Sequence, residues 1–177
     1  MAGIVVATLA ATAAIVATQL APHPQGYAVP GNPCAMVSPA TLARYLPSGS
    51  VSGPLPGSSL SLPGVSKVSG CSWTSGTGDL TVQVSVYGSA TGSTGAKQAF
   101  DQAVRADSRA GPGSGVSTTG ERSVARLGNE AEAIFHRLTP GPSSFVDLHI
   151  WSDNAEVVVS FGAFSKQAGT PQLVSRS

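Results

Sequence analysis

The chain contains two cysteines, Cys34 and Cys71, and this pair constrains the fold more than any other feature. The first follows an Asn-Pro dipeptide, and the second precedes Ser-Trp. An isolated pair in a small chain behind an export-like apolar segment favours a disulfide, because exported proteins fold in oxidising compartments. The bond would join an early helix to the first core strand, with Trp73 packed beside it. The alternative is two buried free thiols, while a redox pair would need close spacing such as C-x-x-C.

Residues 4–20 form an uncharged, mostly apolar run, and the first Lys, Arg, Asp or Glu of the chain is Arg44. The run has about the minimum length that spans the hydrocarbon core of a membrane. We therefore expect residues 1–20 to be a transmembrane anchor or a signal segment. An uncleaved anchor is favoured because no clean A-x-A cleavage site follows, and a buried core helix is the alternative. Residues 21–33, rich in proline, are expected to form an extended linker.

Charged residues make up 11% of the chain, and the formal net charge is +1. No basic cluster is present to displace counterions from phosphates, so we expect no nucleic-acid partner. Residues 34–165 are long enough for one extracytoplasmic domain with a single core. Residues 166–177 are expected to form a flexible tail.

Two helices are expected in the domain. Ser38 is a typical N-cap and Pro39 suits the first helical position, while Pro47 ends this short helix. Apolar residues recur with the helical period in residues 95–109, which predicts the longer helix. Residues 48–64 are rich in serine, glycine and proline, and we expect a surface loop there.

Strands are predicted by alternation of apolar and polar residues, most clearly in residues 80–87. Further strands are expected in residues 65–68, 70–74, 131–138, 145–151 and 156–164. A pair of strands, a helix and then a run of strands indicates an α+β fold with an antiparallel sheet.

Histidine and acidic residues on two of these strands raise the question of a chemical site. His136 and His149 lie on strands expected to pair, and Glu132 and Asp147 would join them in a metal or acid–base site. The pattern favours polar residues on the solvent face of an antiparallel sheet instead. Catalytic motifs such as G-x-S-x-G and H-E-x-x-H are absent from the sequence. We therefore predict no catalytic, cofactor-binding or metal-binding residues.

A candidate binding face is formed by Phe145, Asp147, His149 and Trp151, which alternate along one predicted strand. This mixture of aromatic and polar side chains is typical of recognition surfaces. The face would be either exposed or covered by the helix of residues 95–109. If it is covered, the binding surface would lie on the loops, chiefly residues 48–64.

Three short motifs resemble an uncharacterised family of actinobacterial secreted lipoproteins, the domain of unknown function three-five-five-eight. They are Asn-Pro-Cys-Ala-Met-Val-Ser at 32–38, Gly-Cys-Ser-Trp at 70–73 and Leu-Gly-Asn-Glu-Ala at 127–131. The resemblance implies an extracytoplasmic α+β domain with paired cysteines and a single curved antiparallel sheet, here flanked by two main helices. It offers no catalytic residues, and the family's lipid-attachment cysteine is absent from this sequence.

We expect, from these features, a non-enzymatic, sensor-like domain that binds a cell-envelope ligand or protein partner. Its N-terminal segment would tether it to the outer face of the cell membrane, or the domain would be secreted if that segment is cleaved. The alternatives are a hydrolase with an unrecognised site and a structural envelope protein.

Cell fractionation tests the predicted location. The full-length chain should sediment with membranes and be digested by protease added to intact spheroplasts, because the domain would face outward. A shortened chain in the medium would indicate a cleaved leader. Full-length protein in the cytosol would contradict export.

Overall fold

The computed structural model describes residues 27–29, 31–55, 64–88, 92–109, 115–139 and 143–163. They form one seven-stranded antiparallel sheet with the strand order β1-β2-β3-β7-β6-β5-β4. The predicted α+β class and single antiparallel sheet are confirmed. The strands are β1 (Ser50–Leu55), β2 (Val65–Ser75), β3 (Gly78–Tyr87), β4 (Val116–Ser123), β5 (Glu130–Leu138), β6 (Ser144–Ser152) and β7 (Ala155–Ala163).

The helical elements are the 3-10 turn η1 (Pro33–Met36), the short helix α2 (Pro39–Tyr45) and the long helix α3 (Gly92–Ser108). The predicted cap of α2 is confirmed, because the Ser38 hydroxyl accepts a hydrogen bond from the Thr41 backbone amide at 3.1 Å. The description of two main flanking helices is only roughly right, since α2 has seven residues and the sheet dominates the domain.

One face of the sheet is apolar and carries the main core. The predicted alternation in β3 is confirmed, with Leu80, Val82, Val84 and Val86 all buried. The register places Val82 opposite Val159 of β7, so neighbouring strands add their apolar side chains to the same layer. The core also includes Met36, Val37, Leu46, Trp73, Val146, Leu148, Ile150 and Val157.

The disulfide fixes the N-terminal elements to this apolar face. Cys34 in η1 is bonded to Cys71 in β2, with Cα atoms 5.0 Å apart, and the predicted pairing is confirmed. Cys71 is fully buried and Trp73 is 2% exposed, so the tryptophan is part of the core, as predicted. The bond brings Met36 and Val37 next to the sheet, where both are buried.

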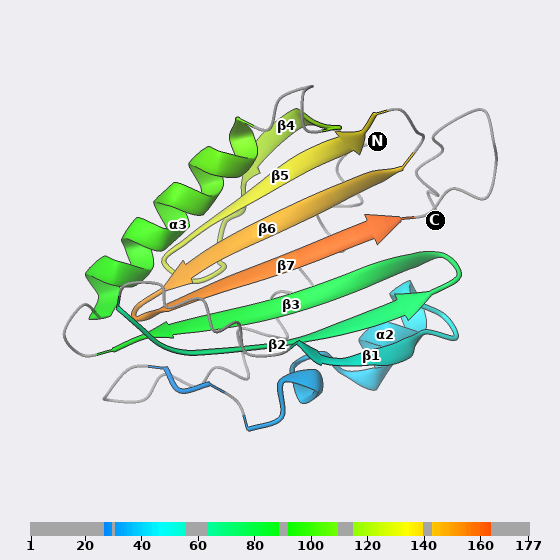
Figure 1. Ribbon diagram of the computed structural model, residues 1–177, viewed down its shortest axis with the longest axis horizontal. Coiled ribbons are helices and arrows are strands. Elements are labelled where there is room, and N and C mark those ends of the chain that lie inside the picture. The colour runs from blue at the N-terminus through cyan, green and yellow to red at the C-terminus, as the bar shows by residue number, and fades with distance from the viewer. Residues whose placement is uncertain are drawn as a thin grey trace.

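Helix α3 lies on the opposite, more polar face of the sheet. It buries Ala96 and Phe100, and its C-terminal end is held by the Thr118 hydroxyl of β4, which donates to the Asp107 carbonyl at 2.7 Å. Figure 1 shows α3 running across the ends of the strands where β3 and β6 finish and β5 and β7 begin, and α2 next to β1 and β2. The ends of β3, β6 and β7 farthest from α3 therefore remain uncovered by this helix.

The turn before β5 requires a glycine. Gly128 has φ +59°, and a Cβ atom there would lie 2.4 Å from the Trp151 carbonyl oxygen and 2.9 Å from Ile150 Cγ2. Any larger residue would collide with the backbone of β6. The Leu-Gly-Asn-Glu segment thus packs the start of β5 closely against the end of β6, where the Asn129 amide donates to Trp151.

Two strands were not predicted from the sequence. The expected surface loop at 48–64 is wrong in its first part, because β1 pairs with β2 as an edge strand over Ser50–Leu55. Strand β4 pairs with β5 at the other edge, in a segment for which we predicted no element. Both contain serine and glycine, which also typify loops, and their alternation of apolar and polar residues is weak.

The predicted anchor at 1–20, most of the linker at 21–33 and the tail at 166–177 lie outside the described residues. In the part of the chain that the structure describes, none of the helices has the length and apolar composition needed to cross a membrane.

Breaking the disulfide should destabilise the domain. The bond closes a loop between residues 37 positions apart, which in the chain-entropy model stabilises the fold by about 4 kcal/mol. Cys34→Ser is the informative change, because Cys34 is half-buried and its hydroxyl replacement avoids a buried polar group. The melting temperature should fall by on the order of 10 °C.

The wild-type chain melted with reductant is the matched control and should behave like the variant. A Cys34→Ser melting temperature equal to that of the oxidised wild type would contradict a stabilising bond.

Candidate functional site

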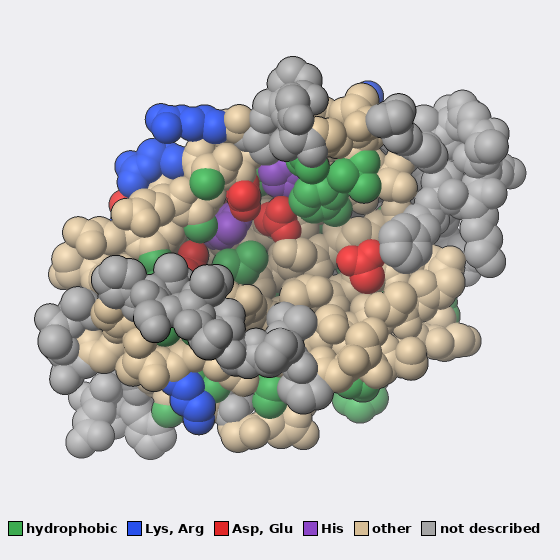
Figure 2. Space-filling view, viewed as in Figure 1, with side chains coloured by type: hydrophobic (Ala, Val, Ile, Leu, Met, Phe, Trp, Pro, Cys, Tyr) green, Lys and Arg blue, Asp and Glu red, His purple; other side chains and the backbone are tan. Residues whose placement is uncertain are grey.

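The face of the sheet beneath and beside α3 carries the polar side chains of the central strands. In the register, Asp147 of β6 lies opposite Ser160 of β7, and Ser160 lies opposite Thr81 of β3. His149 lies opposite Val158, which in turn lies opposite Gln83. Figure 2 shows histidine and acidic side chains side by side on this face, within a surface that is otherwise mostly uncharged.

His149 is held by the C-terminal end of α3. Its Nε2 atom donates to Asp107 Oδ2 at 2.8 Å, and its side chain is only 3% exposed. Asp107 is more open, with 36% of its side chain exposed. The contact joins residues 42 positions apart and fixes the end of the helix over β6.

His136 and Asp147 form a second pair next to the first. His136 Nε2 lies 3.3 Å from Asp147 Oδ2, and the side chains are 2% and 14% exposed. The other Asp147 oxygen, Oδ1, accepts a short hydrogen bond from the Ser160 hydroxyl at 2.5 Å. The carboxylate is therefore oriented by β7 while one oxygen faces the imidazole.

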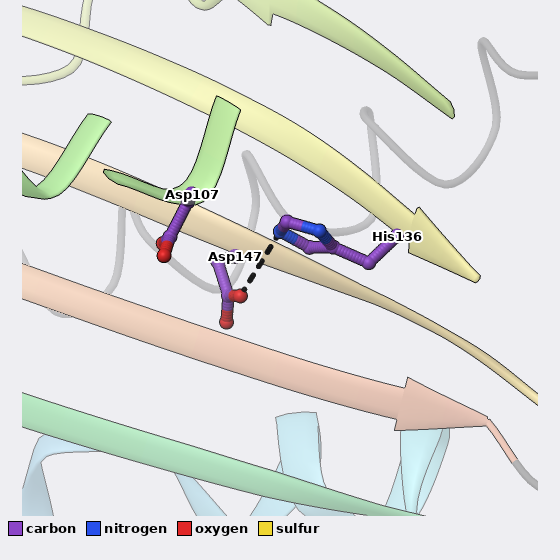
Figure 3. Close-up of side chains that lie close together, drawn as sticks. All are labelled: Asp107, His136 and Asp147. Atoms are coloured by element: carbon purple, nitrogen blue, oxygen red, sulfur yellow. Dashed lines mark ion pairs between the residues drawn. The ribbon is translucent and has the colours of Figure 1, made fainter. Parts of the chain in front are cut away.

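The His136 imidazole has no good hydrogen bond in this arrangement. Neither ring nitrogen has a partner of hydrogen-bonding geometry in the described structure, although Nε2 is close to Asp147. The ring stacks on Phe145, with centroids 4.6 Å apart and planes inclined by 20°. Figure 3 shows the imidazole directed toward Asp147, with Asp107 on the other side of that carboxylate.

Burial dominates the electrostatics of Asp147. It raises the pKa of the carboxyl, and the nearby Asp107 charge raises it further. The Ser160 hydrogen bond and the two histidines act in the opposite direction, because they favour the charged form. No described Lys or Arg forms an ion pair with Asp107 or Asp147, so the two histidines are the basic side chains in contact with these carboxylates.

Glu156 and Tyr87 form a second buried polar group on the same face. Burial raises the pKa of Glu156; among its charged neighbours, His149 lowers the value and Asp107 raises it. Burial, and then the Glu156 charge, raise the pKa of Tyr87 to about 12. The phenol hydroxyl has no partner of good hydrogen-bonding geometry in the described part of the chain, and burial is the main cause of its raised pKa.

The sequence left open whether the predicted binding face is exposed or covered by the long helix. In the structure α3 covers part of it, so the outcome differs from residue to residue. His149 is buried, whereas Phe145, Asp147 and Trp151 are half-buried. Lys97 of α3 lies 5.6 Å from the Trp151 ring centroid, and Trp151 Nε1 donates to the Asp153 carbonyl. The aromatic ring at this end thus packs against the helix, while Phe145 lies at the other end of the strand.

Of the residues weighed for a metal or acid–base site, the structure brings together His136, Asp147 and His149. Glu132 lies opposite His149 in the register but hydrogen-bonds the Ser123 hydroxyl of β4. The second acidic residue of the cluster is Asp107 and not Glu132, and we did not predict Asp107. Its position nine residues before the start of β4 gave no local signal, because the contact depends on how α3 docks.

The arrangement can bind cations or hydrogen-bonding groups, but it is not built for a serine nucleophile. Ser160 donates to Asp147, and in the described structure no serine hydroxyl hydrogen-bonds either histidine. A serine nucleophile needs such a base within reach. In the described structure the carboxylates and imidazoles contact each other.

No family model and no curated protein matches this sequence. The resemblance to the secreted lipoprotein family therefore stays a prediction, and functional inference rests on the site itself.

Glu156 should make the stability of the domain pH-dependent. The pKa of Glu156 is higher in the folded protein than its value of 4.5 in the unfolded chain. The resulting contribution to stability is fully present below pH 4.5, and it is lost as the pH rises through the pKa of the folded protein. Glu156→Gln is uncharged throughout. Its melting temperature relative to that of the wild type should therefore rise as the pH increases above 4.5.

Glu121→Gln is the matched control, because it removes an exposed carboxylate on the edge strand β4. It should show no comparable rise. A Glu156→Gln difference that stays constant or falls with pH would contradict a charge-burial cost at this position.

Proposed function

We propose that this chain is a non-enzymatic, extracytoplasmic domain that binds a cell-envelope ligand or protein partner through one face of its sheet. The binding surface is the part of the polar face beside α3, and we call it the open polar face. All its residues are half-buried: Thr81, Gln83, Phe145, Asp147, Val158 and Ser160.

The contrast between the two faces of the sheet supports this proposal. The apolar face is buried throughout its central strands, as expected for a core. The opposite face carries hydroxyl, amide and carboxylate groups in register on three adjacent strands, with Phe145 at one side. A few polar groups converging beside an aromatic side chain are typical of ligand sites.

Tethering to the envelope is the part of the proposal that rests on the sequence. The disulfide is consistent with folding outside the cytoplasm, because such bonds persist in oxidising compartments. The apolar run at 4–20 supplies the proposed anchor. Together they favour a domain that meets its ligand at the outer face of the membrane.

A hydrolase is the second candidate, and the paired histidines and carboxylates are the observation that favours it. His149 with Asp107 has the geometry of an oriented imidazole. Its Nε2 atom contacts Asp107, however, and its other nitrogen, Nδ1, is buried and has no hydrogen-bond partner among the residues that the structure describes. Because that arrangement leaves no exposed basic nitrogen on His149, we favour binding.

Site-specific photo-crosslinking in intact cells tests the open polar face. A photoreactive residue at Thr81 or Gln83 should give discrete adducts with the envelope ligand, because both side chains lie on the proposed surface. Matched positions are Val51, which is 55% exposed on β1, and Glu121 on β4. These should give none of the same adducts.

Adducts of equal yield from the edge-strand positions would contradict binding through this face. Turnover of an envelope substrate that is lost in His149→Gln, with unchanged melting, would contradict the non-enzymatic assignment.

A further inference from the structure

The cluster beside α3 has the composition of a metal site. Asp107, His136 and Asp147 each offer one ligand atom, and the three atoms lie within 4.8 Å of one another. They come from three different elements, α3, β5 and β6 (Figure 3). Two carboxylates close together disfavour each other's charged form, and among the described basic residues only histidines are in contact with them.

His136 supplies an independent reason to expect a ligand. Its side chain is 98% buried, since 2% is exposed, yet neither ring nitrogen makes a hydrogen bond to any described residue. A buried polar atom without a partner costs on the order of 1–3 kcal/mol. Because Nε2 is directed toward the two carboxylates, a cation between these groups would satisfy it.

We propose that Asp107, His136 and Asp147 bind one divalent transition-metal ion of the zinc type. Ligands around tetrahedral zinc lie about 3.4 Å apart, given bond lengths near 2.1 Å. The separation of His136 Nε2 and Asp147 Oδ2, 3.3 Å, already matches this value. Asp107 is the most exposed of the three and sits at the end of α3, so a small side-chain movement closes the site.

Two further residues hold the ligands in place. His149 donates to Asp107 Oδ2 and leaves the other oxygen of that carboxylate for the ion. Ser160 donates to Asp147 Oδ1 and leaves Oδ2. Such outer contacts orient ligating carboxylates in metal sites. Both are already formed here, so they need not be made when the ion binds.

The mixed nitrogen and oxygen donors select the class of ion. An imidazole with two carboxylates suits zinc, manganese or iron, whereas calcium and magnesium prefer oxygen donors alone. Both cysteines are in the disulfide and supply no thiolate. Three protein ligands leave a position for water or for a donor from the proposed ligand.

This inference goes beyond the proposed function, because metal binding does not require an envelope partner. Its test uses zinc alone and therefore fails or succeeds separately from the crosslinking experiment.

Competition with a fluorescent zinc chelator measures the affinity of the detergent-solubilised, metal-stripped full-length chain. We expect one zinc ion per chain. His136→Gln and Asp147→Asn should each raise the dissociation constant by at least about 100-fold, and His149→Gln by about 10-fold, as outer-contact losses do. X-ray absorption of the zinc-loaded chain should show nitrogen and oxygen ligands with one imidazole.

If the variants of the buried ligands unfold, Asp107→Asn still tests the proposal. Asp107 is partly exposed and lies at a helix end, so we expect this variant to fold. It should also weaken binding by at least about 100-fold, a loss beyond the range for outer contacts. The matched control is Asp79→Asn, which removes a carboxylate from the same face outside the cluster and should leave the affinity unchanged. Melting of each metal-free variant checks its fold.

The proposal is overturned if the wild type binds no stoichiometric zinc. It is equally overturned if folded Asp107→Asn binds like the wild type. The third histidine of the sequence is His23, and loss of binding in His23→Ala with binding kept in His136→Gln would also overturn it. The last result would place the ion elsewhere on the chain.

Discussion

The difference between the two faces of the sheet is the constraint on which the rest of the structure depends. Side chains alternate along a strand, so a register that aligns Val82 with Val159 also aligns Thr81 with Ser160. A slip by one residue would bury the polar row and expose the valines. The apolar face therefore fixes the positions of the polar groups, although it does not touch them.

The disulfide and the docking of α3 act on opposite faces of this sheet. Cys34–Cys71 ties η1 to the apolar side and extends the main core with Met36 and Val37. Helix α3 leaves part of the polar side open, and its end is held by Thr118 and His149. A helix that covered the whole face would have buried the polar row without partners, at a cost in folding free energy.

The sequence predicted those features that depend on local pattern. Alternation of apolar and polar residues predicted β3 and β6, and the capping residues predicted α2. The presence of one isolated pair of cysteines predicted the disulfide. Edge strands β1 and β4 were missed because their residues also suit loops. Only part of the cluster could be predicted from the sequence. The alternation along the strand placed Asp147 and His149 on one face. Asp107 joins them only because α3 docks on the sheet, and no local sequence pattern indicates that docking.

Burying the polar cluster costs folding free energy, and the chain has few charged residues. Nine acidic and ten basic residues serve the whole sequence, yet His136, His149 and Glu156 are buried on this one face. Buried ionic groups are often less stabilising than apolar residues of similar volume. The apolar core on the other face of the sheet offsets this cost, and changes to the polar row leave that core intact. Variants of the exposed part of the polar row can therefore test the proposed ligand binding without altering the packing of the apolar layer.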